Sequence, residues 1–225
     1  GTDYSGSTSV YYRRRLFSAY DETRYGARAA LGRRFGSLWS INLPVKIESV
    51  KLSNIDADAP TEYFDLADSR ALASFGISLT RSTYDNPAFP TRGTRAELSI
   101  EQVAGDFTFT KLGGEFSRYF KLDEGVLGER TTLRLSTSAN YILQDQEEVP
   151  FYERYYLGGD NFRGFDFRGI SPVGIRNDTG GISSEPVGGI FSFFAGAELR
   201  RSLYEDLLSG VVFIDSGVVT DELSF

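Results

Sequence analysis

Long stretches in which apolar and polar residues alternate constrain this chain more than any other feature. Within residues 39–48 every odd position is apolar, and Ser40, Asn42, Lys46 and Glu48 stand at even positions. The same alternation recurs in residues 130–144. Successive side chains of a β-strand point to opposite faces, so this period predicts strands with one apolar face and one polar face.

The pattern predicts about ten strands along the chain. They are expected at residues 9–20, 23–34, 38–52, 71–85, 93–104, 107–122, 129–144, 150–158, 189–203 and 207–220. Most of them are much longer than the ~5–6 residues typical of soluble domains, whereas a strand that crosses a bilayer needs ~9–11. The expected fold class is therefore all-β, an antiparallel transmembrane β-barrel with a polar lumen. A soluble barrel with the opposite orientation of its faces has the same alternation, so that alternative stays open.

Charge and residue types exclude several kinds of function. The formal net charge is −7, which argues against nucleic acid as a partner because phosphate binding needs a basic face. The sequence has no Cys and no His, so thiolate metal sites and the commonest general base are absent. We therefore expect no enzyme activity, no cofactor and no metal. No apolar run reaches the length of a membrane-spanning helix.

The connections between the expected strands differ strongly in length. Residues 53–70 and 159–188 form long connections, whereas short turns are expected at residues 21–22, 36–37 and 105–106. Outer-membrane barrels carry short turns at one rim and long loops at the other, and we expect the same division here. The first long connection is acidic and could hold a divalent cation, but a solvated loop is the favoured interpretation.

The segment at residues 150–172 has the composition of a buried loop. It reads PFYERYYLGGDNFRGFDFRGISP, an aromatic run, a turn signal and two copies of the tripeptide Phe-Arg-Gly. Surface loops are usually rich in small polar residues. Glycine permits close approach to another wall, and buried arginine needs a carboxylate partner. An ordinary long hairpin loop is the alternative that the segment alone leaves open.

Four places in the chain together resemble the BamA-type family of outer-membrane insertases and translocators. They are Gly158-Gly159 with Phe162-Arg163-Gly164-Phe165 and Ile170-Ser171-Pro172; Asp85 with Phe89-Pro90-Thr91-Arg92-Gly93-Thr94; Phe193-Phe194-Ala195-Gly196-Ala197-Glu198-Leu199; and Val212-Phe213-Ile214-Asp215-Ser216-Gly217. They occur in the family's order between about residues 70 and 220. Phe162 departs from the family pattern, which has a β-branched residue there.

The resemblance implies a function and a domain organisation. It implies a factor that folds and inserts β-barrel proteins into the bacterial outer membrane, without nucleotide or covalent chemistry. Its partners would be unfolded outer-membrane β-barrel clients, accessory lipoproteins of the assembly machine and outer-membrane lipids. The family barrel has about sixteen strands. Residues 1–225 would then be a partial barrel that lacks the POTRA domains and the first and last strands, which form the family's lateral gate.

The resemblance also implies a site inside the barrel. The loop would fold back into the lumen, where Arg163 pairs with Glu198 and Asp215 on the inner wall. Strand parity independently predicts that both carboxylates face inward, because positions of the opposite parity are apolar: Ala197 and Leu199 on the strand of Glu198, and Val212 and Ile214 on that of Asp215. Arg168 is a second candidate for the same pocket.

The other residues of the loop motif have expected roles beside that ion pair. Gly164 would permit a tight turn, while Phe162 and Phe165 would pack on the inner wall. The motif as a whole is expected to hold the barrel in register.

Three other functions are alternatives on the sequence alone. A related translocation or secretion barrel, TamA-like or of the two-partner type, would share these motifs. A passive porin would share the alternation and would conduct ions whether or not the Arg163 loop is present. A barrel protease or lipase of the outer membrane is the third alternative, and the absence of His argues against the protease.

Overall fold

The structure, a computed structural model, describes residues 3–122, 131–204 and 208–222. In this part of the chain one antiparallel sheet has the order β1-β2-β3-β4-β5-β6-β7-β10-β11. Its strands are β1 (Tyr4–Leu16), β2 (Asp21–Phe35), β3 (Trp39–Ser53), β4 (Arg70–Ser82), β5 (Gly93–Gly105), β6 (Phe109–Leu122), β7 (Thr131–Ile142), β10 (Phe191–Tyr204) and β11 (Leu208–Thr220). The all-β fold class is confirmed, as part of a barrel.

The long connection between β7 and β10 contains the main departure from the expected elements. The prediction of a strand at residues 150–158 is wrong. This part of the chain has two 3-10 helices, η1 (Gln146–Glu148) and η2 (Phe151–Glu153), followed by isolated β-bridges at Tyr155 and Leu157. Pro150 has a φ of −62° and opens η2, and this aromatic segment lacks the alternation that a paired strand requires. Further along, β8 (Val173–Ile175) and β9 (Ile182–Pro186) form a small hairpin that the pattern did not predict.

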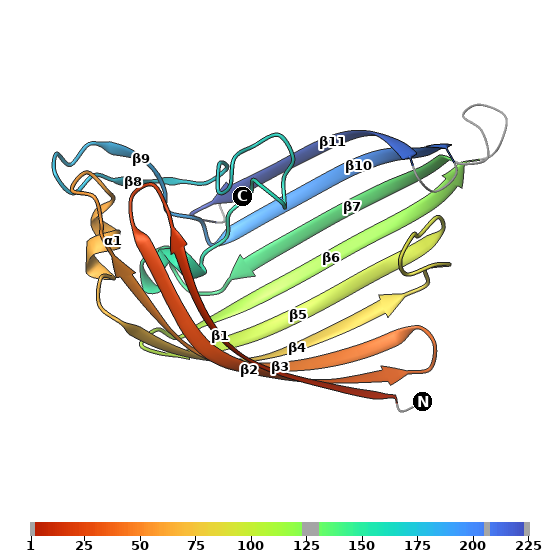
Figure 1. The fold of residues 1–225 in the computed structure, drawn as a ribbon, viewed down its shortest axis with the longest axis horizontal. Helices are drawn as coiled ribbons and strands as arrows, with labels where there is room; N and C mark the ends of the chain where they lie inside the picture. Colours follow the sequence, from red (N-terminus) through yellow and green to blue (C-terminus); the bar gives the residue numbers. More distant parts are fainter. Residues whose placement is uncertain (1–2, 123–130, 205–207, 223–225) are drawn as a thin grey trace.

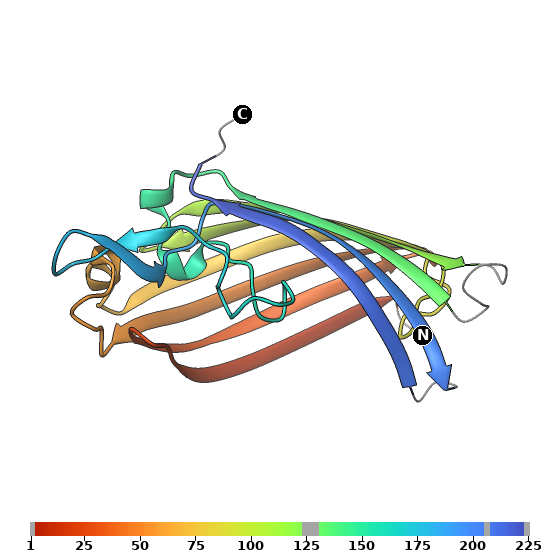
Figure 2. The ribbon, with the colours of Figure 1, turned by 90° about the horizontal axis from the view of Figure 1, so that it is seen from above.

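The sheet curls into a trough around the lumen (Figures 1 and 2). The connections β3–β4 and β7–β10 gather at one rim, together with α1 (Thr61–Asp65), β8 and β9 (Figure 1). Figure 2 shows part of the β7–β10 connection lying over the inner face of the trough. Among the described residues no helix has the length and apolarity needed to cross a membrane.

The two faces of the sheet differ as the alternation predicts. Apolar side chains on the outer face are exposed, for example Val10 at 86% and Ile214 at 75%. Inward positions carry charged groups such as Arg24 and Glu48, which are buried. Because an apolar outer face is stable only in lipid, the orientation is that of a membrane barrel.

The expected division of short and long connections was only partly right. The β1–β2 turn closes through a hydrogen bond from the Phe17 N–H to the Tyr20 carbonyl at 2.9 Å, so Asp21 and Glu22 belong to β2. This turn and the short Gly105–Asp106 turn lie at the rim of the long loops, because alternate connections of an antiparallel meander share a rim.

The Pro-rich turn between β4 and β5, at residues 83–92, lies at the opposite rim from the β7–β10 connection (Figure 1). Three strands, β5, β6 and β7, separate the two connections in the chain. One carboxylate organises this turn: Asp85 Oδ1 accepts hydrogen bonds from the N–H groups of Thr91 at 2.9 Å and Arg92 at 3.1 Å.

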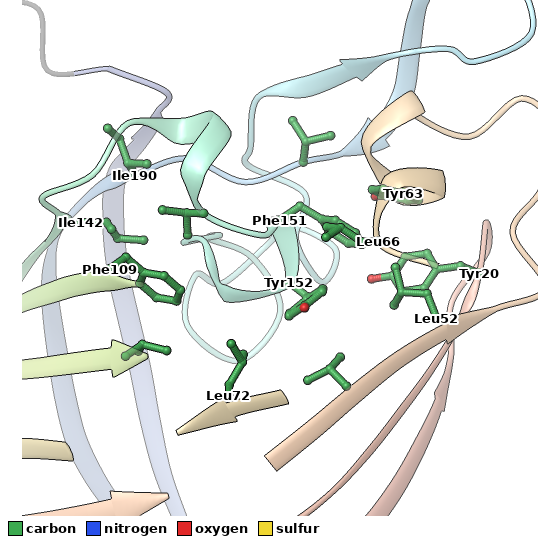
Figure 3. Close-up of a cluster of buried hydrophobic side chains, with 14 of the residues drawn as sticks. Tyr20, Leu52, Tyr63, Leu66, Leu72, Phe109, Ile142, Phe151, Tyr152 and Ile190 are labelled. Atoms are coloured by element: carbon green, nitrogen blue, oxygen red, sulfur yellow. The ribbon is translucent and has the colours of Figure 1, made fainter. Parts of the chain in front are cut away.

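At the long-loop rim an apolar cluster of buried side chains fills the lumen (Figure 3). Inward positions near the strand ends are apolar here, and they contact the loops above them. The cluster includes Tyr20, Leu52, Tyr63, Leu66, Leu72, Phe109, Ile142, Phe151, Tyr152 and Ile190. The Tyr63 and Phe151 rings stack with centroids 4.1 Å apart. The connections at this rim are therefore fixed to the wall by apolar burial.

Adjacent residues on β7 test the assignment of the faces. Leu135 is 41% exposed on the outer face, whereas Ser136 lines a cavity on the inner side. We expect a cysteine at Ser136 to react with a water-soluble thiol reagent in bilayers, and a cysteine at Leu135 to be shielded by lipid. Native cysteines are absent, so the background is low. Equal labelling of the two variants would contradict this orientation.

Candidate functional site

Residues 157–170 form a closed finger that enters the lumen. Leu157 and Ile170 close its base by reciprocal backbone hydrogen bonds of 3.1 and 2.9 Å. Gly158 has a φ of +122°, and a Cβ there would lie 2.1 Å from the Asp166 carbonyl oxygen, so only glycine fits. The finger therefore has a defined shape, with Arg163 near its tip.

The Arg163 guanidinium joins the finger to two neighbouring strands. Its Nε and Nη2 each donate to an Asp215 carboxylate oxygen on β11 at 2.8 Å. Its Nη1 donates to Glu198 Oε2 on β10 at 2.6 Å. Planar arginine suits this arrangement, because its fixed fork of donors matches one carboxylate and leaves further N–H groups for a second.

Three alternate positions of β11 form the wall that receives the finger. The Phe213 ring lies under the guanidinium, with its centroid 3.6 Å from Cζ of Arg163. Asp215 binds the guanidinium, and Gly217 provides space: a Cβ there would lie 2.9 Å from Cε2 of Phe162. We did not predict the contribution of Phe213, although its parity with Asp215 already placed it on the inner face.

The remaining motif residues have unequal roles. Phe162 is buried against Leu157 and Val219. Phe165 packs edge-on to Phe162 at 5.2 Å but is 52% exposed, so the expected packing on the wall holds fully only for Phe162. Gly164 has a φ of +85° and open space around it, so backbone conformation is what favours glycine there.

Water has partial access to this ion pair. The Arg163 side chain is 36% exposed, Glu198 is 20% exposed and Asp215 is 3% exposed. Hydrogen bonds to Asp215 and Glu198 raise the pKa of Arg163, so the guanidinium stays charged at all physiological pH values. Arg134 lies directly opposite Glu198 in the β7–β10 register and supplies a second positive charge nearby.

Arg168 occupies a different place from Arg163. Its Nη1 donates to the Tyr20 hydroxyl at 2.7 Å, and its guanidinium lies over the Tyr156 ring at 4.3 Å. Burial raises the pKa of Tyr20 to about 12, so this hydroxyl is neutral. Arg168 thus contacts the β1–β2 turn, and its candidacy for the Asp215 pocket was wrong.

Two acidic residues of the 53–70 connection pair with arginines of the β7–β10 connection. Glu62 Oε2 lies 2.8 Å from Arg154 Nη2, and Asp58 Oδ2 lies 3.6 Å from Arg176 Nη2. In the described part of the chain no three acidic residues are grouped closely enough to hold a metal ion.

Comparison with known proteins places this geometry in context. The sequence matches the Omp85 superfamily domain over residues 1–224. It is 27% identical, over 97% of this chain and 27% of the relative, to the outer membrane protein assembly factor BamA of Nitratidesulfovibrio vulgaris strain Hildenborough. The fold is similar to the crystal structure of BamA from Haemophilus ducreyi lacking POTRA domains 1–3, with a TM-score of 0.78 and 23% identity. That match covers 96% of this chain and 46% of the solved chain.

Replacement of Arg163 tests the ion pair. Arg163→Ala leaves Asp215 and Glu198 without their donor, but partial exposure moderates the effect. We expect a loss of about 1–3 kcal/mol, below the ~3–5 kcal/mol typical of a fully buried pair. Arg163→Lys should recover part of it, since an ammonium group cannot bind both carboxylates in the same way. The measurement is the temperature at which the folded barrel loses its fast mobility on a gel. Arg168→Ala, at the separate Tyr20 site, is the comparison. Wild-type stability in Arg163→Lys would contradict the forked geometry, because an ammonium group would then replace the guanidinium at no cost.

Gly217 tests whether the wall has to accept the Phe162 ring. Gly217→Val places methyl groups where Leu157 and Phe162 pack. We expect the finger to be displaced and Arg163 to become accessible to an arginine-modifying reagent, while the barrel still forms. Gly210→Val on the same strand is the control, because a Cβ at Gly210 meets only Leu203 at 3.5 Å or more. Unchanged reactivity of Arg163 in Gly217→Val would show that the ring does not need this space.

Proposed function

Because this chain belongs to the Omp85 superfamily, we propose that it is the membrane part of a factor that folds and inserts other β-barrel proteins. Superfamily membership places the protein in the bacterial outer membrane, as a barrel that catalyses no covalent reaction. The observation that carries the proposal is the alignment with an outer membrane protein assembly factor over 97% of this chain. This chain spans about a quarter of that relative, so the activity of the whole protein is part of the proposal.

We infer that the described strands form part of a larger, closed barrel of about sixteen strands. The sheet is open between β1 and β11 (Figure 2). An open edge in lipid leaves backbone N–H and C=O groups without partners, at a cost of several kcal/mol for each group. Further strands would therefore pair with β1 and β11. POTRA domains would belong to the rest of the protein.

The proposed mechanism uses the same backbone chemistry. An opened barrel presents the unpaired edge of a strand, and an incoming client segment pairs with that edge. The client thereby satisfies its own backbone groups before it meets lipid. The finger that carries Arg163 would hold the wall at β10 and β11 in shape while the edges separate. Neither nucleotide nor metal is needed in this scheme.

The proposed partners follow from this mechanism. They are unfolded outer-membrane β-barrel proteins as clients, accessory lipoproteins of the assembly machine, and the lipids of the outer membrane. The apolar outer face contacts the lipids, with side chains such as Val10 and Ile214. A related translocation or secretion barrel uses the same fold, and the experiment below separates it from an insertase.

Reconstitution of the full-length protein in proteoliposomes tests the proposal. A urea-unfolded outer-membrane barrel is added, and its folded fraction is measured by protease protection and by gel mobility without heating. We expect faster client folding than in empty liposomes or in liposomes with an unrelated porin. Transport of a soluble secreted protein into the vesicles, without faster folding of the client barrel, would instead identify a secretion barrel.

A further inference from the structure

A second group of charges lies inside the lumen, away from Arg163. It comprises Glu22 and Arg24 on β2, Lys46 and Glu48 on β3, Lys111 on β6, and Glu153 on η2. The side chains of Arg24, Glu22, Glu48 and Glu153 are at most 9% exposed. We refer to these six residues as the base cluster.

Glu153 is the member that joins the loop to the wall. Its Oε1 lies 2.8 Å from Arg24 Nη1, and its Oε2 lies 2.7 Å from Lys111 Nζ. Strands β2 and β6 are separated by β3, β4 and β5 in the sheet. One carboxylate therefore binds cations from two strands that are not neighbours, which the curvature of the sheet brings together. Arg24 also donates to the Tyr152 carbonyl at 3.0 Å, which fixes the backbone of η2.

The remaining members satisfy the other polar atoms of the base cluster. Arg24 Nε donates to Glu22 at 2.9 Å, and Lys46 Nζ donates to Glu48 at 2.6 Å. The Tyr11 hydroxyl donates to the second oxygen of Glu48 at 2.8 Å. The three carboxylates balance the three cations, as buried charges require.

Glu153 is ionised in this environment. Burial alone would raise the pKa of this carboxyl, but Lys111, Lys46 and Arg24 lower it well below its usual range. Removal of the charge would therefore leave the buried Arg24 and the partly buried Lys111 with less compensating negative charge. Removal of one partner from a buried ion pair destabilises a protein more than loss of an exposed ion pair. We therefore expect loss of the Glu153 charge to disturb the loop measurably.

The base cluster and Arg163 hold the same connection to different parts of the sheet. Glu153 lies ten residues before Arg163 and binds the wall at β2 and β6, whereas Arg163 binds β10 and β11. Extensive contacts between described strands occur only between neighbours in a sheet. The loop is thus a direct polar link between the two sides of the lumen.

We propose that Glu153 is a positioning residue, which fixes the base of the lumen loop so that Arg163 reaches Asp215 and Glu198. The contact at the tip then depends on the contact at the base, whereas the base does not depend on the tip. Glu153 itself contacts neither the two wall carboxylates nor the outer surface. This inference concerns the loop alone and is tested without any client protein.

Spin-label distances in the full-length protein in bilayers provide the test. One pair joins the base to β3, with cysteines at Glu148 and Ile47; the other joins the tip to β11, with cysteines at Asp166 and Ile214. All four positions are exposed, residues 1–225 contain no cysteine, and any cysteine elsewhere in the full-length protein is replaced by serine beforehand. We expect Glu153→Gln to broaden both distance distributions. Arg163→Ala should broaden only the tip distribution.

Control variants separate positioning from general loss of stability. Glu147→Gln makes the same chemical change at an exposed residue of the same connection and should leave both distributions as in the wild type. Glu153→Asp keeps the charge, so its tip distance distribution should be narrower than that of Glu153→Gln. If Glu153→Gln does not fold, Lys111→Gln removes one partner of Glu153 and carries the same expectation. A tip distribution that stays as narrow as in the wild type, when the base is broadened, would overturn the proposal.

Discussion

The need to pair every backbone group in lipid determines most of this structure. Long antiparallel strands meet that need, and their alternation sends apolar side chains to the outside and polar ones into the lumen. Charges that face a narrow lumen must then be matched by opposite charges. The base cluster and the ion pair of Arg163 both meet this requirement. The loop between β7 and β10 supplies Glu153 to the first and Arg163 to the second.

The alternation of apolar and polar residues, together with the family motifs, was sufficient to predict much of the fold. The alternation predicted the nine strands of the sheet to within a few residues at most ends, and parity placed Glu198 and Asp215 on the inner wall. Both carboxylates accept hydrogen bonds from Arg163, the partner that the family resemblance implied for them. The predicted strand at residues 150–158 is absent because Pro150 opens a 3-10 helix and the aromatic residues that follow do not alternate with polar ones, so only isolated bridges form at Tyr155 and Leu157.

The base cluster could not be predicted from period or spacing. Arg24 and Glu153 are 129 positions apart, and their meeting depends on the curvature of the sheet and on the path of a loop with no regular pattern. Glu153 also stands among aromatic residues, a context that gives no sign of a charged partner. A local signal existed for the five members on strands, because Glu22, Arg24, Lys46, Glu48 and Lys111 all have the inward parity of their strands.

The two anchors of the loop differ in how water affects them. The side chains of Arg24, Glu22, Glu48 and Glu153 are at most 9% exposed, and Arg24 contacts the backbone of Tyr152 in the apolar cluster, so exclusion of water strengthens these ionic contacts. Arg163 is 36% exposed, so water competes there for the hydrogen-bonding groups and screens the charges. The contact at the tip is therefore the less costly of the two to break. A movement of β10 and β11 relative to the rest of the sheet would release Arg163 first, while the base of the loop stays bound to β2 and β6.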